Sequence, residues 1–194
     1  MDDTAPTDGA LIAAFWSVVA EQGWAGTTMH RVAGAAGMPV AELRDRFPDR
    51  LAVLHLHLDV VDGTMSHAVS ASLSEPVHDR LHDVLMCRIE ALQPHRAGIL
   101  RFAEDMRRDP LLMLALLPRL QISMREVIEA AGLEVSGLLA PLQLKGMLGV
   151  WLGVLRAWQQ DDSPDLGHTM AEADKALTRA GQWARRLGLE PREW

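Results

Sequence analysis

The sequence has a single cysteine, Cys87, and lacks the motifs of the common enzyme classes. One cysteine excludes an intrachain disulfide framework and a metal site built from several thiolates. No nucleophile-elbow, phosphate-loop, dinucleotide-binding or HExxH motif occurs. The sequence therefore predicts a protein that is not an enzyme and that holds no cofactor and no metal.

Long apolar runs without charges are also absent. The most apolar run, residues 138–158, contains Pro141, Lys145 and Arg156, whereas a membrane-spanning helix needs about 20 apolar residues with few or no charges. The first ten residues are acidic and have no apolar core, unlike a secretory signal peptide. We expect a soluble, cytoplasmic protein.

No segment alternates apolar and polar residues with the two-residue period of a half-buried strand. Apolar residues instead recur every three or four positions, which is typical of amphipathic helices. Residues 111–120 are apolar on nearly every side, and such a helix is expected to be buried centrally. We predict an all-α fold with helices over residues 10–22, 29–36, 40–46, from 50 onward, 77–92, 96–107, 111–131, 138–159 and 166–187.

A helix-turn-helix pattern begins at Thr27. Thr27 or Thr28 can cap the first helix, and Gly37 can end it with a left-handed backbone conformation. Pro39 fits the first turn of the short second helix, where its missing N–H costs nothing. Asp49 can cap the helix that follows. In this motif the second helix enters the DNA major groove.

This stretch resembles the DNA-binding head of the TetR family of ligand-responsive repressors. The matching segments are TT at 27–28, VAGAAGM at 32–38, Leu43, FP at 47–48 and the apolar run 51–54. The sequence departs from the family at Val40, Glu42 and Arg44, where a donor such as lysine, a small hydroxyl residue and a tyrosine are usual. The chain contains no tyrosine. The resemblance implies a TetR-like, all-α fold with a disordered tail at 1–9, a head at 10–56 and a ligand-binding, dimerising body at 57–190.

A function as a homodimeric repressor of double-stranded operator DNA follows from this resemblance. The net charge of −7, and four arginines against eight carboxylates in residues 1–60, require a local basic patch for such binding. Arginine can bind guanine through two hydrogen bonds. The predicted DNA-binding residues are Thr28, His30, Arg44, Arg46 and Arg50.

The body helices are expected to enclose a small apolar or lipid-like ligand. Methionine adapts to irregular space and to varied partners, so the methionines of these helices either fill the core or line a cavity. The predicted ligand-binding residues are Phe102, Met106, Met113, Leu117, Met124, Met147 and Trp151.

Three glycines of the 138–159 helix form a GxxGxxxG spacing that allows another helix to approach closely. The partner helix lies either in the same chain or in a second subunit. In the TetR family the last two long helices pair with those of a second copy. The predicted dimer-interface residues are Gly146, Gly149, Leu152, Gly153, Trp158 and Trp183.

A second resemblance gives the alternative function. Segments 91–98, 108–112 and 156–177 are similar to the TetR-fold lipid-binding accessory proteins of ubiquinone biosynthesis. Such proteins bind isoprenoid lipids in the body, present intermediates to a hydroxylase and do not use the head for DNA. The basic stretch 181–194 carries two tryptophans but is short, so membrane-surface contact is not expected.

Two further patterns suggest metal sites but lack ligands. His78 and His82 are four residues apart on a predicted helix, without a third ligand placed by the sequence. The acidic turn 161–165 lacks the glycine and the final glutamate of a calcium-binding loop. We therefore predict that this turn caps the last helix.

Overall fold

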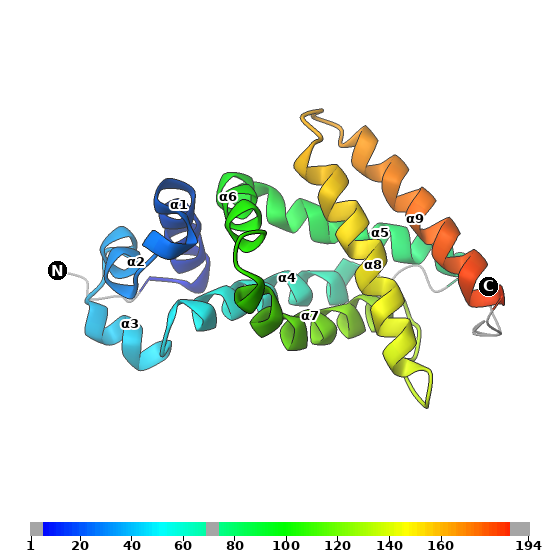
Figure 1. Cartoon of the computed structure of the whole chain (residues 1–194), viewed down its shortest axis with the longest axis horizontal. Helices are drawn as coiled ribbons and strands as arrows, with labels where there is room; N and C mark the ends of the chain where they lie inside the picture. Colours follow the sequence, from blue (N-terminus) through cyan, green and yellow to red (C-terminus); the bar gives the residue numbers. More distant parts are fainter. Residues whose placement is uncertain (1–5, 69–73, 187–194) are drawn as a thin grey trace. The chain divides into compact units, whose positions relative to one another are not determined.

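The computed structural model describes residues 6–68 and 74–186. Over these ranges every regular element is helical (Figure 1), which confirms the predicted all-α fold. The helices α3 and α5 have the predicted bounds. The elements are α1 (Asp8–Gly26), α2 (Met29–Ala36), α3 (Val40–Arg46), α4 (Arg50–Ala68), α5 (Val77–Leu92), η1 (Gln93–His95), α6 (Arg96–Met106), α7 (Pro110–Ala130), α8 (Ala140–Gln159) and α9 (Gly167–Arg186).

The predicted ends of the chain are described only in part. Residues 1–5 of the expected tail and residues 187–194 of the basic C-terminal stretch lie outside the described residues. Residues 8 and 9 of the expected tail already belong to α1, because the Thr7 hydroxyl accepts a hydrogen bond from the Ala10 N–H (3.3 Å) and caps this helix.

The chain divides into two compact units. The first unit contains the residues up to Val60 together with Leu92–Leu116, and the second contains Val61–Ala91 and the residues from Leu117 onward. Helices α4 and α7 therefore contribute residues to both units. The functional division into a head at 10–56 and a body at 57–190 stays a prediction.

An aromatic cluster forms much of the core of the first unit, where α1 packs on α6. The Trp24 ring lies 5.0 Å from the Phe102 ring and 6.3 Å from the Phe15 ring between centroids, in edge-to-face geometry. Gly98 of α6 makes this packing possible, because a Cβ atom there would lie 2.5 Å from the carbonyl oxygen of Trp16.

Gly23 bends α1 close to its end. Its φ of +66° and ψ of 174° are readily adopted only by glycine. The sequence predicted that the helix ends here, but one further turn follows and continues to Gly26. The bend is held by two hydrogen bonds. Trp24 N–H donates to Asp105 Oδ2 of α6 (2.7 Å), and the Thr27 hydroxyl donates to the Gly23 carbonyl (2.7 Å).

In the second unit, α8 and α9 pack side by side (Figure 1). The residues that α9 buries recur at every fourth position: Thr169, Ala173, Leu177 and Gly181. Trp158 of α8 is fully buried as well. Helix α9 therefore has one buried and one open face, as an amphipathic helix does.

The turn between α8 and α9 is organised by Asp161. Its Oδ2 accepts hydrogen bonds from the backbone N–H and the hydroxyl of Thr169, both at 2.8 Å, and its Oδ1 accepts from Ser163. The Thr169 N–H is one of the donors that the first turn of a helix leaves without an intrahelical partner. The acidic turn therefore caps α9, as the sequence predicted.

The prediction that residues 111–120 are buried centrally is wrong. Leu111 and Leu114 are 76% and 62% exposed, whereas Leu112 and Leu116 are buried. Among the described residues, α7 thus buries one side of this segment and leaves apolar residues on its other sides in contact with solvent. No helix within residues 6–68 and 74–186 is long and apolar enough to span a bilayer.

Replacing Gly98 with alanine should destabilise the protein. The added methyl group would press on the backbone of α1, and overpacking of this kind costs about 1–3 kcal/mol. Urea denaturation measures the loss. Gly63→Ala is the matched control, because Gly63 lies inside α4 and a Cβ atom there meets no described atom within 4 Å. Alanine at position 63 should raise the free energy of unfolding by about 0.5–1 kcal/mol. Equal effects at both positions would contradict the close contact between α1 and α6.

Asp161 should make the stability depend on pH in the acidic range. The hydrogen bond from Ser163, followed by those from Thr169, holds the pKa of Asp161 well below its usual value. A carboxylate whose pKa is lowered on folding stabilises the protein above its unfolded pKa of about 3.9, and this stabilisation is lost as the pH falls towards the folded pKa. Asp161→Asn should therefore lower the thermal midpoint at neutral pH. The difference from the wild type should shrink between about pH 4 and about pH 2. A difference that is constant over this range would contradict a role for the charge.

Candidate nucleic-acid interface and buried polar cluster

The helix-turn-helix is built by the predicted caps. The Thr28 hydroxyl accepts a hydrogen bond from the Arg31 N–H (3.3 Å) at the start of α2. Gly37 ends α2 with a φ of +69°, and the Met38 N–H returns to the Ala33 carbonyl (3.0 Å). Pro39 differs slightly from the prediction, since it precedes the first helical residue of α3 instead of lying in its first turn.

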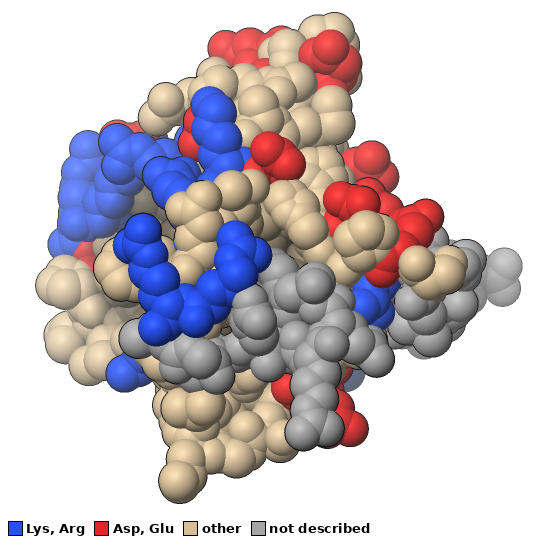
Figure 2. Space-filling view, turned by 90° about the vertical axis from the view of Figure 1, so that its right-hand side faces the viewer, with Lys and Arg blue, Asp and Glu red and all other residues tan. Residues whose placement is uncertain are grey.

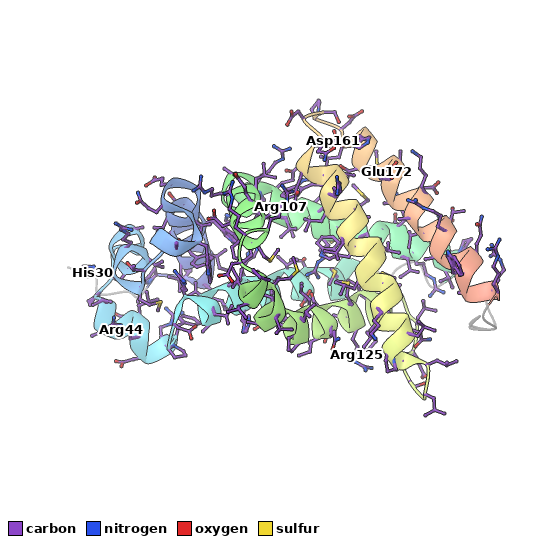
Figure 3. The ribbon with its side chains drawn as sticks, viewed as in Figure 1. His30, Arg44, Arg107, Arg125, Asp161 and Glu172 are labelled. Carbon is purple, nitrogen blue, oxygen red and sulfur yellow. The ribbon has the colours of Figure 1, made fainter. Side chains whose placement is uncertain are left out.

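One face of each short helix is buried and the other is open. Val32 of α2 and Leu43 of α3 are fully buried, which fixes how the two helices pack. His30 and Arg44 are exposed and lie on the outer side of α2 and α3 (Figure 3). The Arg44 side chain makes no hydrogen bond or ion pair with any described residue. This outer side therefore presents polar donors to solvent.

Arg46 is engaged with the start of α1. Its guanidinium group donates to Asp8 Oδ1 at 2.6 Å and to the Pro6 carbonyl at 3.4 Å, and it lies 5.3 Å from the centre of the Phe47 ring. These contacts hold α3 against the N-terminal end of α1. The pair is exposed, so it contributes about 0–1 kcal/mol to stability.

Arg50 is bound more firmly within the protein. Its Nη1 donates to the carbonyl groups of Trp24 and Thr27, and its guanidinium group lies 4.3 Å from the centre of the Trp24 ring. The side chain thus satisfies backbone carbonyls where α1 leads into α2. Arg50 anchors α4 to this junction, a position that the local sequence pattern did not reveal.

The predicted ligand-binding residues do not form one group. Phe102 belongs to the aromatic core of the first unit, and Met113 is exposed. In the second unit Met124 and Trp151 are buried, and Met147 lines a surface groove. Met106 and Leu117 are half-buried, in the first and second unit respectively. Their role in ligand binding stays a prediction.

The second unit contains a buried polar cluster that sequence reasoning missed. Arg88 of α5 donates from Nη1 to Asp62 of α4 and from Nη2 to the Ser123 hydroxyl (2.6 Å). Ser123 donates in turn to Asp62 Oδ1 (2.6 Å), and Arg119 of α7 donates to Asp62 Oδ2 (2.7 Å). The Arg88 guanidinium group lies 4.8 Å from the centre of the Trp151 ring on α8. Side chains from four helices thus meet at Arg88.

Burial alone would raise the pKa of Asp62. The charge of Arg88 and the hydrogen bonds from Ser123, Arg88 and Arg119 outweigh burial and lower the pKa, so Asp62 is ionised at neutral pH. One sequence signal could have revealed the cluster. Arg88 falls on the face of α5 that also carries the buried Val84, four residues earlier. A charged residue on an inward face indicates a buried polar contact.

A groove of about 1140 Å³ lies along α8, α9 and the segment before α8. Gly146, Gly149 and Gly153 line it, and a Cβ atom at any of them meets no described atom within 4 Å. Within the described residues these glycines therefore do not pack closely against another helix, and their place in a subunit interface stays a prediction. Trp183 also lines the groove and is 61% exposed. Of the other predicted interface residues, Leu152 is exposed and Trp158 lies in the core.

Most of the chain is similar in structure to solved transcriptional regulators. The TetR transcriptional regulator from Nitrosomonas europaea ATCC 19718 has a TM-score of 0.72 and 19% identity, over 91% of this chain and 99% of the other. The fold is that of the TetR family. A TetR regulator from Rhodococcus sp. RHA1 has a TM-score of 0.57 and 16% identity, over 89% of this chain and 93% of the other. No protein-family model matches the sequence, and no curated protein matches it significantly.

Within this TetR-like fold, two arginines of the helix-turn-helix should differ in their effect on stability. Arg50→Gln removes charge-assisted hydrogen bonds to two carbonyls and should lower the free energy of unfolding by about 1–3 kcal/mol. Arg44→Gln removes no contact within the described chain and should change stability by less than about 0.5 kcal/mol. Urea denaturation of both variants measures the difference. A larger loss for Arg44→Gln would contradict the assignment of Arg50 as the anchor.

Proposed function

We propose that the protein is a DNA-binding transcriptional repressor that responds to a small apolar ligand and is not an enzyme. The observation that carries this proposal is the outer side of α2 and α3. The inward residues Val32 and Leu43 are buried, while His30 and Arg44 remain exposed. A short second helix held in this way can enter a DNA major groove.

The predicted DNA-binding residues divide into two groups. Arg44 can donate two hydrogen bonds to guanine, and Thr28 and His30 can contact phosphates at the start of α2. Arg46 and Arg50 would act indirectly. The guanidinium group of Arg46 holds α3 against the start of α1, and that of Arg50 holds α4 against the end of α1. From residue 28 to residue 50 the segment carries four arginines against three carboxylates, in a chain whose net charge is −7. Binding would therefore depend on this local patch.

The exposed groove on α8 and α9 supports a homodimer. A stripe of glycines that nothing in the described chain covers lets a helix of a second copy approach closely. On the face that carries the end of α9, Lys and Arg gather on one side and Asp and Glu on the other side and at the upper edge (Figure 2). If two copies meet through this face about a two-fold axis that runs between the two sides, the basic side of each copy lies opposite the acidic side of its partner.

A homodimer would place two copies of α3 about one DNA turn, roughly 34–36 Å, apart, so that both read successive major grooves. The ligand would act by shifting the population between arrangements of the two heads that do and do not fit this spacing.

Binding to fluorescent DNA from both sides of its own gene tests the proposed function. The purified protein should bind one fragment with an affinity that falls steeply as salt is raised, because neutralised phosphates release counterions. Arg44→Gln should weaken binding by about 1–3 kcal/mol and reduce discrimination against mutated sites.

Arg156→Gln is the matched control, because Arg156 is exposed on α8, away from α2 and α3 in the sequence. Its affinity for DNA should equal that of the wild type. If no fragment is bound at low salt, the protein is not a repressor of its own region. Recovery of an isoprenoid lipid with such a protein would then favour the alternative accessory role.

A further inference from the structure

The second unit buries more positive than negative charge around α5. Arg80 and Arg88 lie on this helix with exposed fractions of 5% and 1%. Arg119 of α7 approaches from a neighbouring helix, and its side chain is 11% exposed. The carboxylate that pairs with Arg88 and Arg119 is Asp62. Asp62 therefore faces two arginines, and Arg80 adds a further positive charge on α5.

Some hydrogen-bond donors of Arg80 and Arg88 have no acceptor among the described residues. Arg88 binds Asp62 and Ser123 through its terminal nitrogens, but its Nε is buried without an acceptor among the described residues. The Nε of Arg80 is likewise buried without an acceptor, and Arg80 forms no ion pair with a described side chain. Leaving a charged donor buried and unpaired costs several kcal/mol. Each such buried group calls for an explanation, and a bound ligand that accepts the hydrogen bond is one.

The surroundings of these arginines are apolar. Arg80 and Arg88 are eight positions apart, about 12 Å along α5, with the fully buried Val84 midway between them. The Met65 sulfur lies 3.8 Å from Arg88 Nη1, and the Trp151 ring covers the guanidinium group at 4.8 Å. Cationic donors next to apolar side chains match a ligand with an acidic group at the end of an apolar body.

We propose that Arg80, Arg88 and Arg119 bind the carboxylate of an aliphatic acid, and that this acid is the ligand of the body. The carboxylate would accept hydrogen bonds from the unused Arg88 and Arg80 donors and would compete with Asp62 for Arg88 and Arg119. Entry would occur at Arg119, the most exposed member of the cluster. The aliphatic acid would be the small apolar ligand of the proposed repressor. That acid binding alters the affinity for DNA rests on the proposed function, whereas acid binding itself does not.

Paired probes test this inference on the full chain. Saturated fatty acids from hexanoate to hexadecanoate are each compared with the alcohol of the same length, and affinity is followed by tryptophan fluorescence and isothermal calorimetry. At least one acid should bind the wild type tenfold or more tightly than its alcohol. In Arg88→Met this preference should disappear, so that the acid and its alcohol bind with about equal affinity.

If Arg88→Met does not fold, Arg80→Met still tests the inference, because Arg80 makes no ion pair with a described residue that the substitution would break. This variant should bind the alcohol as the wild type does and bind the acid several-fold more weakly. Arg179→Met is the matched control. Arg179 lines the groove on α9 and pairs at the surface with Glu172, so its loss should leave the preference for the acid unchanged.

Three outcomes would overturn the inference: no binding of any acid, equal affinity for each acid and its alcohol, or loss of the preference in Arg179→Met but not in the α5 variants. The last outcome would place the carboxylate in the surface groove. Specific DNA binding without a preference for acids would leave the proposed function intact. A preference for acids without DNA binding would leave the ligand site intact and contradict the repressor.

Discussion

The peptide groups on either side of Trp24 are held by charged side chains from two other helices. Asp105 of α6 accepts the Trp24 N–H, and Arg50 of α4 donates to the Trp24 carbonyl. Both bonds depend on the positive φ of Gly23, which turns the last helical turn of α1 towards α6. The start of α2, and with it the outer side of the helix-turn-helix, is positioned by this junction. Helix α3 keeps this position, with Arg44 exposed on its outer side, only while the junction is intact.

Local chemistry explains why much of the fold could be predicted from the sequence. Thr28, Gly37 and Asp49 act within three or four residues of their own position, so the caps that they form can be recognised without the rest of the chain. The periodicity of α5 predicted its buried face for the same reason. The resemblance to the TetR family added the arrangement of these helices, which the solved structures confirm as a fold.

The parts that could not be predicted depend on contacts between distant residues. The anchoring contacts of Arg50 were missed because its partners lie 23 and 26 residues earlier, and Arg88 went unnoticed because Asp62 and Ser123 lie on other helices. The exposure of α7 was missed for a related reason. Composition shows how apolar a helix is, but only the fold determines how many of its sides are covered.

Helix α4 carries a charged anchor in each unit, with Arg50 at its start and Asp62 twelve residues later, about 18 Å along one uninterrupted helix. If binding at one anchor shifts the equilibrium at the other, the two are linked thermodynamically. If an acid in the body weakens the hold of Arg88 on Asp62 and thereby lowers the affinity for DNA, bound DNA must lower the affinity for the acid by the same factor. The operator would then act as an effector of ligand binding, and the ligand concentration that releases the protein would rise with the strength of the operator.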